Sequence, residues 1–231
     1  MTLHRLIGLL VALVLLMGCS RTHLPIVTLP SEEDGHAYVA IIISGDGGWA
    51  TIDKEIAQHL GRKGIPTVGL DSLRYFWFPR TQTEVGQALT QVLAQADLSW
   101  TDRKFILIGF SRGANALPFM IEEISPTLRD RIVRVALLSP SAGTAFEFRL
   151  RDWFDNSPVK NALPMEPALE ALGDLDVLCI YGEDDPDAVC PHLPPGLVTV
   201  IAFPGGHHVH SEYSEVVRDI LRGLPQLSEK R

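Results

Sequence analysis

The fold is decided by residues 104–116, KFILIGFSRGANA. Residues 105–108 are apolar throughout, as in a strand that is buried on both faces of a sheet, and residues 114–117 begin a helical pattern. Between them stands Gly109-Phe110-Ser111-Arg112-Gly113, a G-x-S-x-G pattern at a strand-to-helix turn. Its glycines permit a sharp turn, and the serine hydroxyl then lies at a helix N-terminus, where partial positive charge favours a developing anion. The sequence predicts a nucleophilic Ser111; the alternative is a glycine-rich turn with an exposed serine.

The same strand and helix signals alternate along the rest of the chain. Runs that resemble buried parallel strands cover residues 38–44, 65–70, 104–109, 132–138, 177–181 and 198–203, and helical periodicity covers residues 53–63, 83–96, 114–124 and 212–221. This alternation predicts an α/β fold with a mostly parallel sheet of about six to eight strands and helices on both faces. With the serine turn placed as it is, the expected architecture is the α/β-hydrolase fold. Residues 140–172 break the alternation and are expected to hold an extra strand, from Thr144 to Arg149, and a small cap.

Length and charge exclude several classes of protein. The chain has 231 residues, 28 acidic and 20 basic side chains and a formal net charge of −8, which fits one globular domain and disfavours binding to nucleic acid. No G-x-G-x-x-G or lysine-containing phosphate loop is present, so we expect no cofactor. No metal site is expected, because His207 and His208 point apart in an extended chain and no second group of ligands is evident.

The N-terminus has the features of an export signal. An apolar run from Leu6 to Met17 follows Arg5 and is too short for a comfortable transmembrane helix, so residues 1–18 are expected to be a signal peptide. The run ends in Leu16-Met17-Gly18-Cys19, which resembles a bacterial lipobox. We therefore expect a periplasmic protein that is anchored to a bacterial membrane through lipid on Cys19, with a tether over residues 19–36 and the hydrolase domain over residues 37–231. An ordinary signal peptide with a chance cysteine would also place the chain outside the cytoplasm.

The tether is expected to include an edge strand from Leu24 to Leu29.

Lipidation of Cys19 would leave Cys179 and Cys190 as a pair. In an oxidising compartment they are predicted to form a disulfide that holds the intervening loop; two unpaired buried thiols are the alternative.

A nucleophilic serine requires a base and an acid later in the chain. In the α/β-hydrolase fold the order is Ser, Asp or Glu, then His. The loop after the fifth strand run offers Asp185, three residues past Gly182, as the acid, with Asp184 and Asp187 left open. The same spacing from Gly205 favours His208 as the base over His207.

A second loop has the composition of an oxyanion hole. Residues 44–49, SGDGGW, follow the first strand run, and their glycines let the backbone approach a substrate. The backbone N–H of Asp46 or Gly47, together with that of Arg112, is expected to hold the oxyanion.

After the next strand run, residues 73–79, LRYFWFP, contain four large aromatic side chains in succession. They would bind lipid if exposed and form part of the core if buried.

These segments together resemble the bacterial virulence protein family typified by VirJ and AcvB: residues 44–49, residues 71–77, the Ser111 pentapeptide, the loop from Cys179 to Cys190, and residues 205–208. The resemblance covers nearly the whole expected mature chain. It implies a periplasmic hydrolase that releases lysine from lysyl-phosphatidylglycerol, an aminoacylated membrane phospholipid, and a link to virulence and secretion-system components. In that reading Ser111 attacks the lysyl ester, an acidic side chain meets the lysyl ammonium groups, and Arg74 or Arg112 contacts the lipid phosphate.

Two other functions compete with this one. The first is another extracytoplasmic esterase or lipase, which shares the same residues. The second is a non-catalytic adaptor for a secretion system, which would not need the serine turn, the acid and the histidine together.

Overall fold

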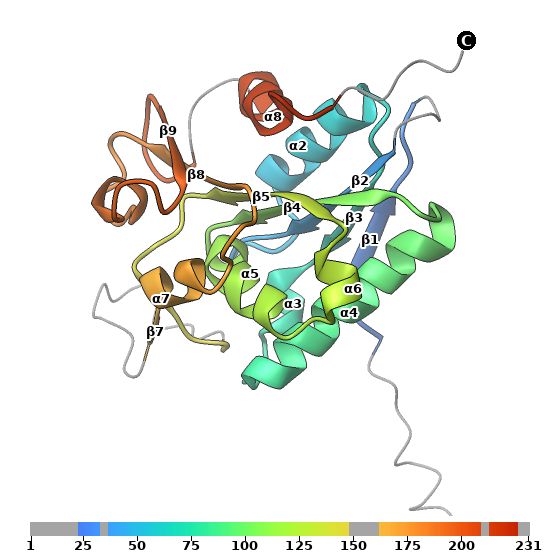
Figure 1. Cartoon of the computed structure of the whole chain (residues 1–231), viewed down its shortest axis with the longest axis horizontal. Coiled ribbons are helices and arrows are strands. Elements are labelled where there is room, and N and C mark those ends of the chain that lie inside the picture. The colour runs from blue at the N-terminus through green and yellow to red at the C-terminus, as the bar shows by residue number, and fades with distance from the viewer. Residues whose placement is uncertain (1–22, 33–36, 148–161, 209–212, 226–231) are drawn as a thin grey trace, which may run out of the picture.

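The computed structural model describes residues 23–32, 37–147, 162–208 and 213–225 (Figure 1). The expected signal peptide and Cys19 lie outside the described residues, as do residues 33–36 of the expected tether. Among the helices that the structure describes, none is both long enough and apolar enough to cross a membrane.

A seven-stranded sheet forms the centre of the molecule, in the order β1-β3-β2-β4-β5-β8-β9. Its strands are β1 (Ile26–Leu29), β2 (Tyr38–Ile43), β3 (Thr67–Leu70), β4 (Lys104–Phe110), β5 (Ile132–Leu138), β8 (Val177–Gly182) and β9 (Thr199–Phe203). Neighbouring strands are parallel except for β1, which is antiparallel to β3. The predicted, mostly parallel sheet is confirmed, and each strand run predicted from the sequence overlaps one strand, with ends that differ by at most two residues.

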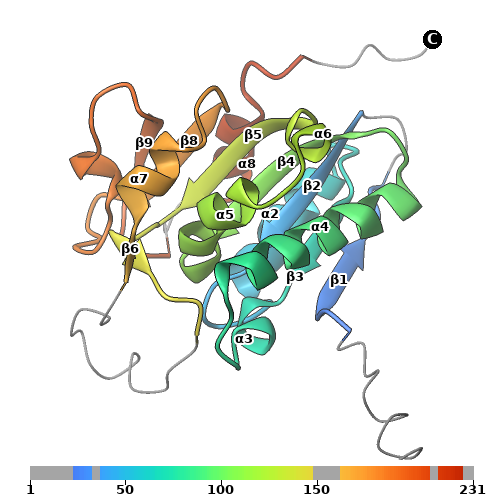
Figure 2. The ribbon, with the colours of Figure 1, turned by 60° about the horizontal axis from the view of Figure 1, so that its bottom comes forward.

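Helices cover both faces of this sheet. They are α2 (Thr51–Gly61), α3 (Ser72–Tyr75), α4 (Gln82–Ser99), α5 (Arg112–Glu122), α6 (Pro126–Arg129), α7 (Met165–Glu170) and α8 (Tyr213–Leu221), with a 3-10 turn at Cys190–His192. Alternate residues of β4 face opposite ways: Phe105 and Leu107 pack with α4, α5 and α7, whereas Ile106 and Ile108 pack with α2 and α8. Figures 1 and 2 show α2 and α8 together on one side of the sheet and α4 and α5 on the other.

Two further strands were expected outside the main strand runs. The edge strand expected from Leu24 to Leu29 is present as β1 over Ile26–Leu29, and it joins the sheet edge by pairing Ile26 with Leu70 and Leu29 with Thr67. The extra strand expected from Thr144 to Arg149 is shorter: β6 (Gly143–Thr144) pairs with β7 (Leu163–Pro164) in a two-stranded ribbon. Residues 148–161 of the expected cap lie outside the described residues.

The parallel strands end at one common edge, and the loops that follow them carry the candidate site. This carboxyl edge is where open α/β sheets place their ligands. Ser111 follows β4, Asp185 follows β8 and His207 follows β9. The fold therefore brings together three residues that are up to 96 positions apart in the chain.

Candidate active site

Ser111 stands at a strained turn between β4 and α5. Its backbone has φ 51° and ψ −115°, outside the helical and extended regions. Glycines on both sides allow this turn: a Cβ on Gly109 would lie 2.6 Å from Cα of Ala114, and one on Gly113 would lie 2.0 Å from the carbonyl oxygen of Ile43. The two glycines of the pattern are thus required by close backbone contacts, and they leave Ser111 at the N-terminus of α5.

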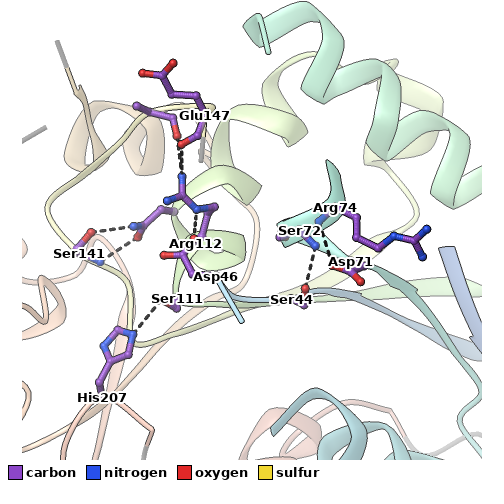
Figure 3. A network of polar contacts seen from close by, with 12 residues as sticks. Ser44, Asp46, Asp71, Ser72, Arg74, Ser111, Arg112, Ser141, Glu147 and His207 are labelled. Atoms are coloured by element: carbon purple, nitrogen blue, oxygen red, sulfur yellow. Dashed lines mark hydrogen bonds and ion pairs between the residues drawn. The ribbon is translucent and has the colours of Figure 1, made fainter. Parts of the chain in front are cut away.

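A histidine and a carboxylate align with this serine. Nε2 of His207 lies 2.9 Å from Oγ of Ser111 (Figure 3). Nδ1 of the same ring lies 2.8 Å from Oδ2 of Asp185. With a proton on Nδ1, the ring donates to the carboxylate and Nε2 accepts the serine O–H. This is the geometry of a Ser-His-Asp triad, in which the carboxylate orients the imidazole and the imidazole takes the serine proton.

The sequence-based choice of His208 as the base is corrected by this geometry. The alternative that the spacing left open, His207, occupies the position between Ser111 and Asp185. The reason is the turn after β9: Gly205 has φ 102°, so the chain bends before the histidines, and counting residues from that glycine misplaces the base by one. His208 is exposed and lies beside the ring of Phe110, with 5.6 Å between ring centroids.

Asp185 is held by its own loop and by the histidine loop. Its side chain is 2% exposed, and its Oδ1 accepts the backbone N–H of Asp187 at 3.1 Å. The backbone N–H of Asp184 donates to the carbonyl of Gly205 at 2.9 Å, so the acid loop and the base loop are joined directly. The other acids that the sequence left open, Asp184 and Asp187, are exposed.

The predicted disulfide between Cys179 and Cys190 is present, with 5.6 Å between the two Cα atoms. It connects β8 to the 3-10 turn and so closes the loop that carries Asp185. Within that loop Gly182 is needed for close approach, because a Cβ there would lie 2.2 Å from the carbonyl oxygen of Gly206. The bridge thus closes the acid loop, and the contact at Gly182 brings it against the histidine loop.

The glycine-rich loop after β2 lies directly against the nucleophile. A Cβ on Gly45 would lie 2.8 Å from the ring of Phe110 and 3.4 Å from Cβ of Ser111. Arg112 is the first residue of α5, and the first N–H groups of a helix have no partner within the helix. This adjacency fits the expected oxyanion hole, with one N–H from Arg112 and one from Asp46 or Gly47.

The Arg112 side chain ties this loop to the segment after β6. Its Nε donates to Oδ1 of Asp46, and its Nη1 donates to the carbonyls of Ala145, at 3.2 Å, and Glu147, at 2.8 Å (Figure 3). The hypothesis that Arg112 binds a lipid phosphate is therefore not supported, because its guanidinium is occupied within the protein. Arg74, the other candidate, is exposed on α3, and its side chain extends away from the Arg112–Asp46 pair.

Two of the segments that carry the family resemblance, residues 44–49 and 71–77, pack against each other. Oγ of Ser44 accepts the backbone N–H of Ser72 at 2.9 Å. Gly48, with φ 71°, passes so close to α3 that a Cβ would lie 2.9 Å from Oδ1 of Asp71. The ring of Trp49 covers Gly69 of β3, where a Cβ would lie 2.1 Å from the ring. Residues 44–49 and 71–77 are thus one structural unit beside the nucleophile.

Sequence reasoning missed polar residues that hold the loops around the site. Ser139, at the end of β5, is buried with φ 50° and donates its hydroxyl to the carbonyl of His207 at 2.7 Å. On α5, the Asn115 side chain exchanges hydrogen bonds with Ser141, accepting its backbone N–H at 2.9 Å and donating to its Oγ at 2.7 Å. A serine directly after a buried strand was the only available signal for Ser139.

No cluster of three or more His, Cys, Asp or Glu side chains suited to hold a metal occurs among the residues that the structure describes.

Solved structures share this fold over most of their length. Est1E from Butyrivibrio proteoclasticus matches with a TM-score of 0.61 and 14% identity, covering 84% of this chain and 90% of Est1E. An esterase from Pyrococcus furiosus matches with a TM-score of 0.57 and 14% identity, over 86% and 89% of the two chains. A serine hydrolase without a lid from Xanthomonas campestris matches with a TM-score of 0.56 and 16% identity, over 88% and 90%. A search of curated proteins found no match.

The fold and the residues at its carboxyl edge define the class: the chain has the α/β-hydrolase fold. Within that class, residues 37–227 match the family model described as bacterial virulence protein (VirJ). The chain belongs to the VirJ family, as the resemblance of its motifs predicted.

Proposed function

We propose that this protein is a periplasmic serine hydrolase that cleaves the lysyl ester of lysyl-phosphatidylglycerol. The observation that carries the proposal is the continuous contact from Ser111 through His207 to Asp185, at 2.9 Å and 2.8 Å. Among the proteins that share the fold is one described as an esterase, which supports ester chemistry for this site. The lysyl lipid itself rests on the family.

The first half of the reaction forms an acyl-enzyme. His207 takes the proton of Ser111 while Oγ bonds to the lysyl carbonyl carbon, and the carbonyl oxygen becomes an oxyanion. The N–H of Arg112 and an N–H of the Asp46–Gly47 segment hold that oxyanion. Asp185 stabilises the imidazolium, which then gives its proton to the leaving glycerol oxygen, and phosphatidylglycerol departs.

The second half returns the enzyme to its starting state. Water replaces the lipid, His207 takes one of its protons, and the hydroxide oxygen bonds to the acyl carbon. Collapse of the intermediate breaks the bond to Ser111 Oγ, which regains its proton from His207, and lysine is released. Glu183, Asp184 and Asp187 are exposed on the acid loop, and carboxylates at this edge suit a dicationic lysyl group.

The proposed location depends on the N-terminus. Export by the signal peptide and lipid on Cys19 would hold the enzyme at the membrane that contains its substrate. Mass spectrometry of the mature protein checks this part: we expect a diacylglyceryl group on an N-terminal Cys19, and an unmodified N-terminus at another residue would contradict it.

The activity is tested with vesicles that contain lysyl-phosphatidylglycerol. We expect the purified protein to release free lysine. The rate of lysine release by Ser111→Ala should be lower by about a thousandfold or more. Lysine release that persists in the variant would refute the nucleophile. If neither protein releases lysine but simple p-nitrophenyl esters are cleaved, the enzyme is a different esterase; inactivity on both substrates would favour the adaptor.

A further inference from the structure

The loop between α3 and α4 exposes two large aromatic side chains in succession. Trp77 is 53% exposed and Phe78 is 65% exposed, whereas the preceding Tyr75 and Phe76 are buried at 4% and 1%. The aromatic segment 73–79 is therefore divided: its first half anchors the loop in the core and its second half projects from the surface. Exposing adjacent Trp and Phe side chains to water is unfavourable, and such a patch marks an interaction surface.

The start of the described chain lies beside this loop. Because β1 is antiparallel to β3, its first residue, Ile26, pairs with Leu70 at the end of β3. The carbonyl of Pro25 accepts the backbone N–H of Asp71 at 3.0 Å. Figures 1 and 2 both show the chain entering β1 at the α3 side of the sheet. The segment that leads to Cys19 therefore leaves the domain at the same edge as Trp77, Phe78 and Ser111.

The surface between the tether and the loop is hollowed and carries basic side chains. A hollow of about 290 Å³ is lined by His23, Arg74, Phe78 and Arg80, among others. Arg80 is turned inward, since its Nε donates to the carbonyl of Tyr75 at 3.1 Å and its Nη1 lies 3.9 Å from Glu84. Arg74 is exposed on the rim. The chain as a whole has a net charge of −8, so this hollow differs from the average surface in its basic side chains.

We propose that residues 74–78 dock on the surface of an anionic phospholipid bilayer. Trp77 and Phe78 enter the boundary between headgroups and acyl chains, where aromatic side chains are favoured, and Arg74 binds lipid phosphate. The orientation agrees with the proposed anchor: His23 is four positions after Cys19, and an extended chain of that length spans at most about 14 Å. The carboxyl edge of the sheet, with Ser111, then faces the bilayer. This deepens the proposed function by explaining how a lipid ester reaches the serine.

The loop is also linked to the active site. The backbone N–H of Arg80 donates to the carbonyl of Phe146 at 2.8 Å, and the neighbouring carbonyls of Ala145 and Glu147 accept from Arg112. The ring of Phe146 stacks on Phe76, with 6.4 Å between centroids. Docking through this loop thus places the bilayer next to the segment that borders the catalytic serine.

Depth-dependent fluorescence quenching tests the docking itself. The full-length protein is mixed with vesicles of phosphatidylethanolamine and phosphatidylglycerol whose acyl chains are brominated, and tryptophan emission is compared with that of Trp77→Phe. We expect quenching that is largely lost in the variant and weakened in Arg74→Gln. Quenching that is equal in the protein and in Trp77→Phe would overturn the proposal, because Trp77 would then lie outside the bilayer.

Hydrolysis provides a second, independent measurement. In the Trp77→Ser/Phe78→Ser double variant we expect the rate on vesicle lipid to fall by about tenfold or more, with the rate on a soluble ester nearly unchanged. The matched control is Leu98→Ser, at the far end of α4 and 83% exposed, which should leave both rates unchanged. Equal losses on both substrates would contradict docking. Quenching by brominated lipid without any lysine release would refute the proposed activity and leave docking intact.

Discussion

Ser111 has a backbone conformation that few serines adopt. Holding a non-glycine residue at φ 51° and ψ −115° costs on the order of 1–3 kcal/mol, which the surrounding structure must offset. It is held by its own N–H, which donates to the carbonyl of Leu138 at 2.8 Å, and by its carbonyl, which accepts from Asn115 at 2.9 Å. In this conformation Oγ lies 2.9 Å from Nε2 of His207, so the proposed nucleophile and its base are in contact without a substrate.

The adjacent histidines give a sharp test of the site. We predict that His207→Ala lowers kcat on any ester by about a thousandfold or more, because Ser111 loses its base. We predict that His208→Ala retains most of the activity, since its ring contacts Phe110 and His207, and His207 supplies the nitrogen beside Ser111. Steady-state kinetics of both variants on a p-nitrophenyl ester make the comparison. The reverse ranking would restore the base assignment that sequence spacing favours.

At this scale the sequence predicted residue types better than exact positions. Ser111 could be placed because its glycines fix the turn locally. Asp185 could be placed from its distance to the end of a strand, and the structure puts it against the histidine. The choice between His207 and His208 depended on the conformation of Gly205, which no spacing rule contains. Ser139 reaches the site through the backbone carbonyl of His207, so no side-chain pairing in the sequence pointed to its role.

Among the elements, α5 and the loop after β2 are joined by Arg112. We predict that Arg112→Met lowers kcat by about ten- to a hundredfold with little change in KM for a small ester, because the oxyanion loop loses its tie to α5. The backbone N–H at this position is kept, so only positioning is tested. Arg112→Lys is the matched control: it keeps the charge but loses the planar fork, and it should be intermediate. An unchanged kcat in Arg112→Met would show that the ion pair has no part in catalysis.

The disulfide supports the element that carries the acid. We predict that Cys179→Ala/Cys190→Ala lowers the free energy of unfolding by about 2–4 kcal/mol, because the loop is no longer closed in the unfolded chain. Activity should fall as well, since the position of Asp185 depends on that loop. Chemical denaturation and ester kinetics measure the two effects. Stability equal to that of the unaltered protein would mean that the loop is held by its other contacts alone.

Strands with a strong apolar pattern were predictable, whereas the pairing of edge strands and the shortest strands were not. Strand β5 has the bounds predicted for it, because a buried parallel strand is apolar on both faces. Strand β1 lies within the edge strand predicted from Leu24 to Leu29, but its partner β3 and its antiparallel direction were not predicted. The ribbon of β6 and β7 pairs two-residue strands, too short for periodicity to reveal.

At the scale of the whole molecule, a buried carboxyl couples stability to pH. Burial raises the pKa of Asp53 from 3.8 to about 6, although its hydrogen bond from the N–H of Ala50 lowers it. Asp53 Oδ1 is buried and finds no hydrogen-bond partner in the described part of the chain. The folded protein therefore binds the proton of the Asp53 carboxyl more tightly than the unfolded chain does. The contribution of protonated Asp53 to stability is present below the unfolded pKa of 3.8 and is lost as the pH rises through the folded pKa of about 6.

We predict that Asp53→Asn becomes more stable relative to the unaltered protein as the pH rises from about 4 to about 7, by at most about 3 kcal/mol. Asparagine keeps an acceptor for the N–H of Ala50 but does not titrate. Urea unfolding of both proteins at the two pH values gives the difference directly. A difference that does not change with pH would show that Asp53 has an ordinary pKa in the folded protein.

The whole molecule also sets what the sequence alone could reveal about the substrate. Residues 73–79 had two interpretations, core and lipid-binding surface, and the structure assigns Phe76 to the core and Trp77 and Phe78 to the surface. Exposure depends on which helices cover each side chain, and therefore on the complete fold. The substrate is even harder to predict from the sequence. A Ser-His-Asp arrangement is common to many ester hydrolases, and only the family resemblance points to a lysyl lipid.

Covalent trapping tests the central claim most directly. A fluorophosphonate reacts with a serine that an adjacent histidine activates, and the adduct is located by mass spectrometry of peptides. We predict a single adduct on Ser111, retained in His208→Ala and lost in His207→Ala. Absence of any adduct, or an adduct on another residue, would contradict the assignment of Ser111, His207 and Asp185 as the catalytic residues of this VirJ-family protein.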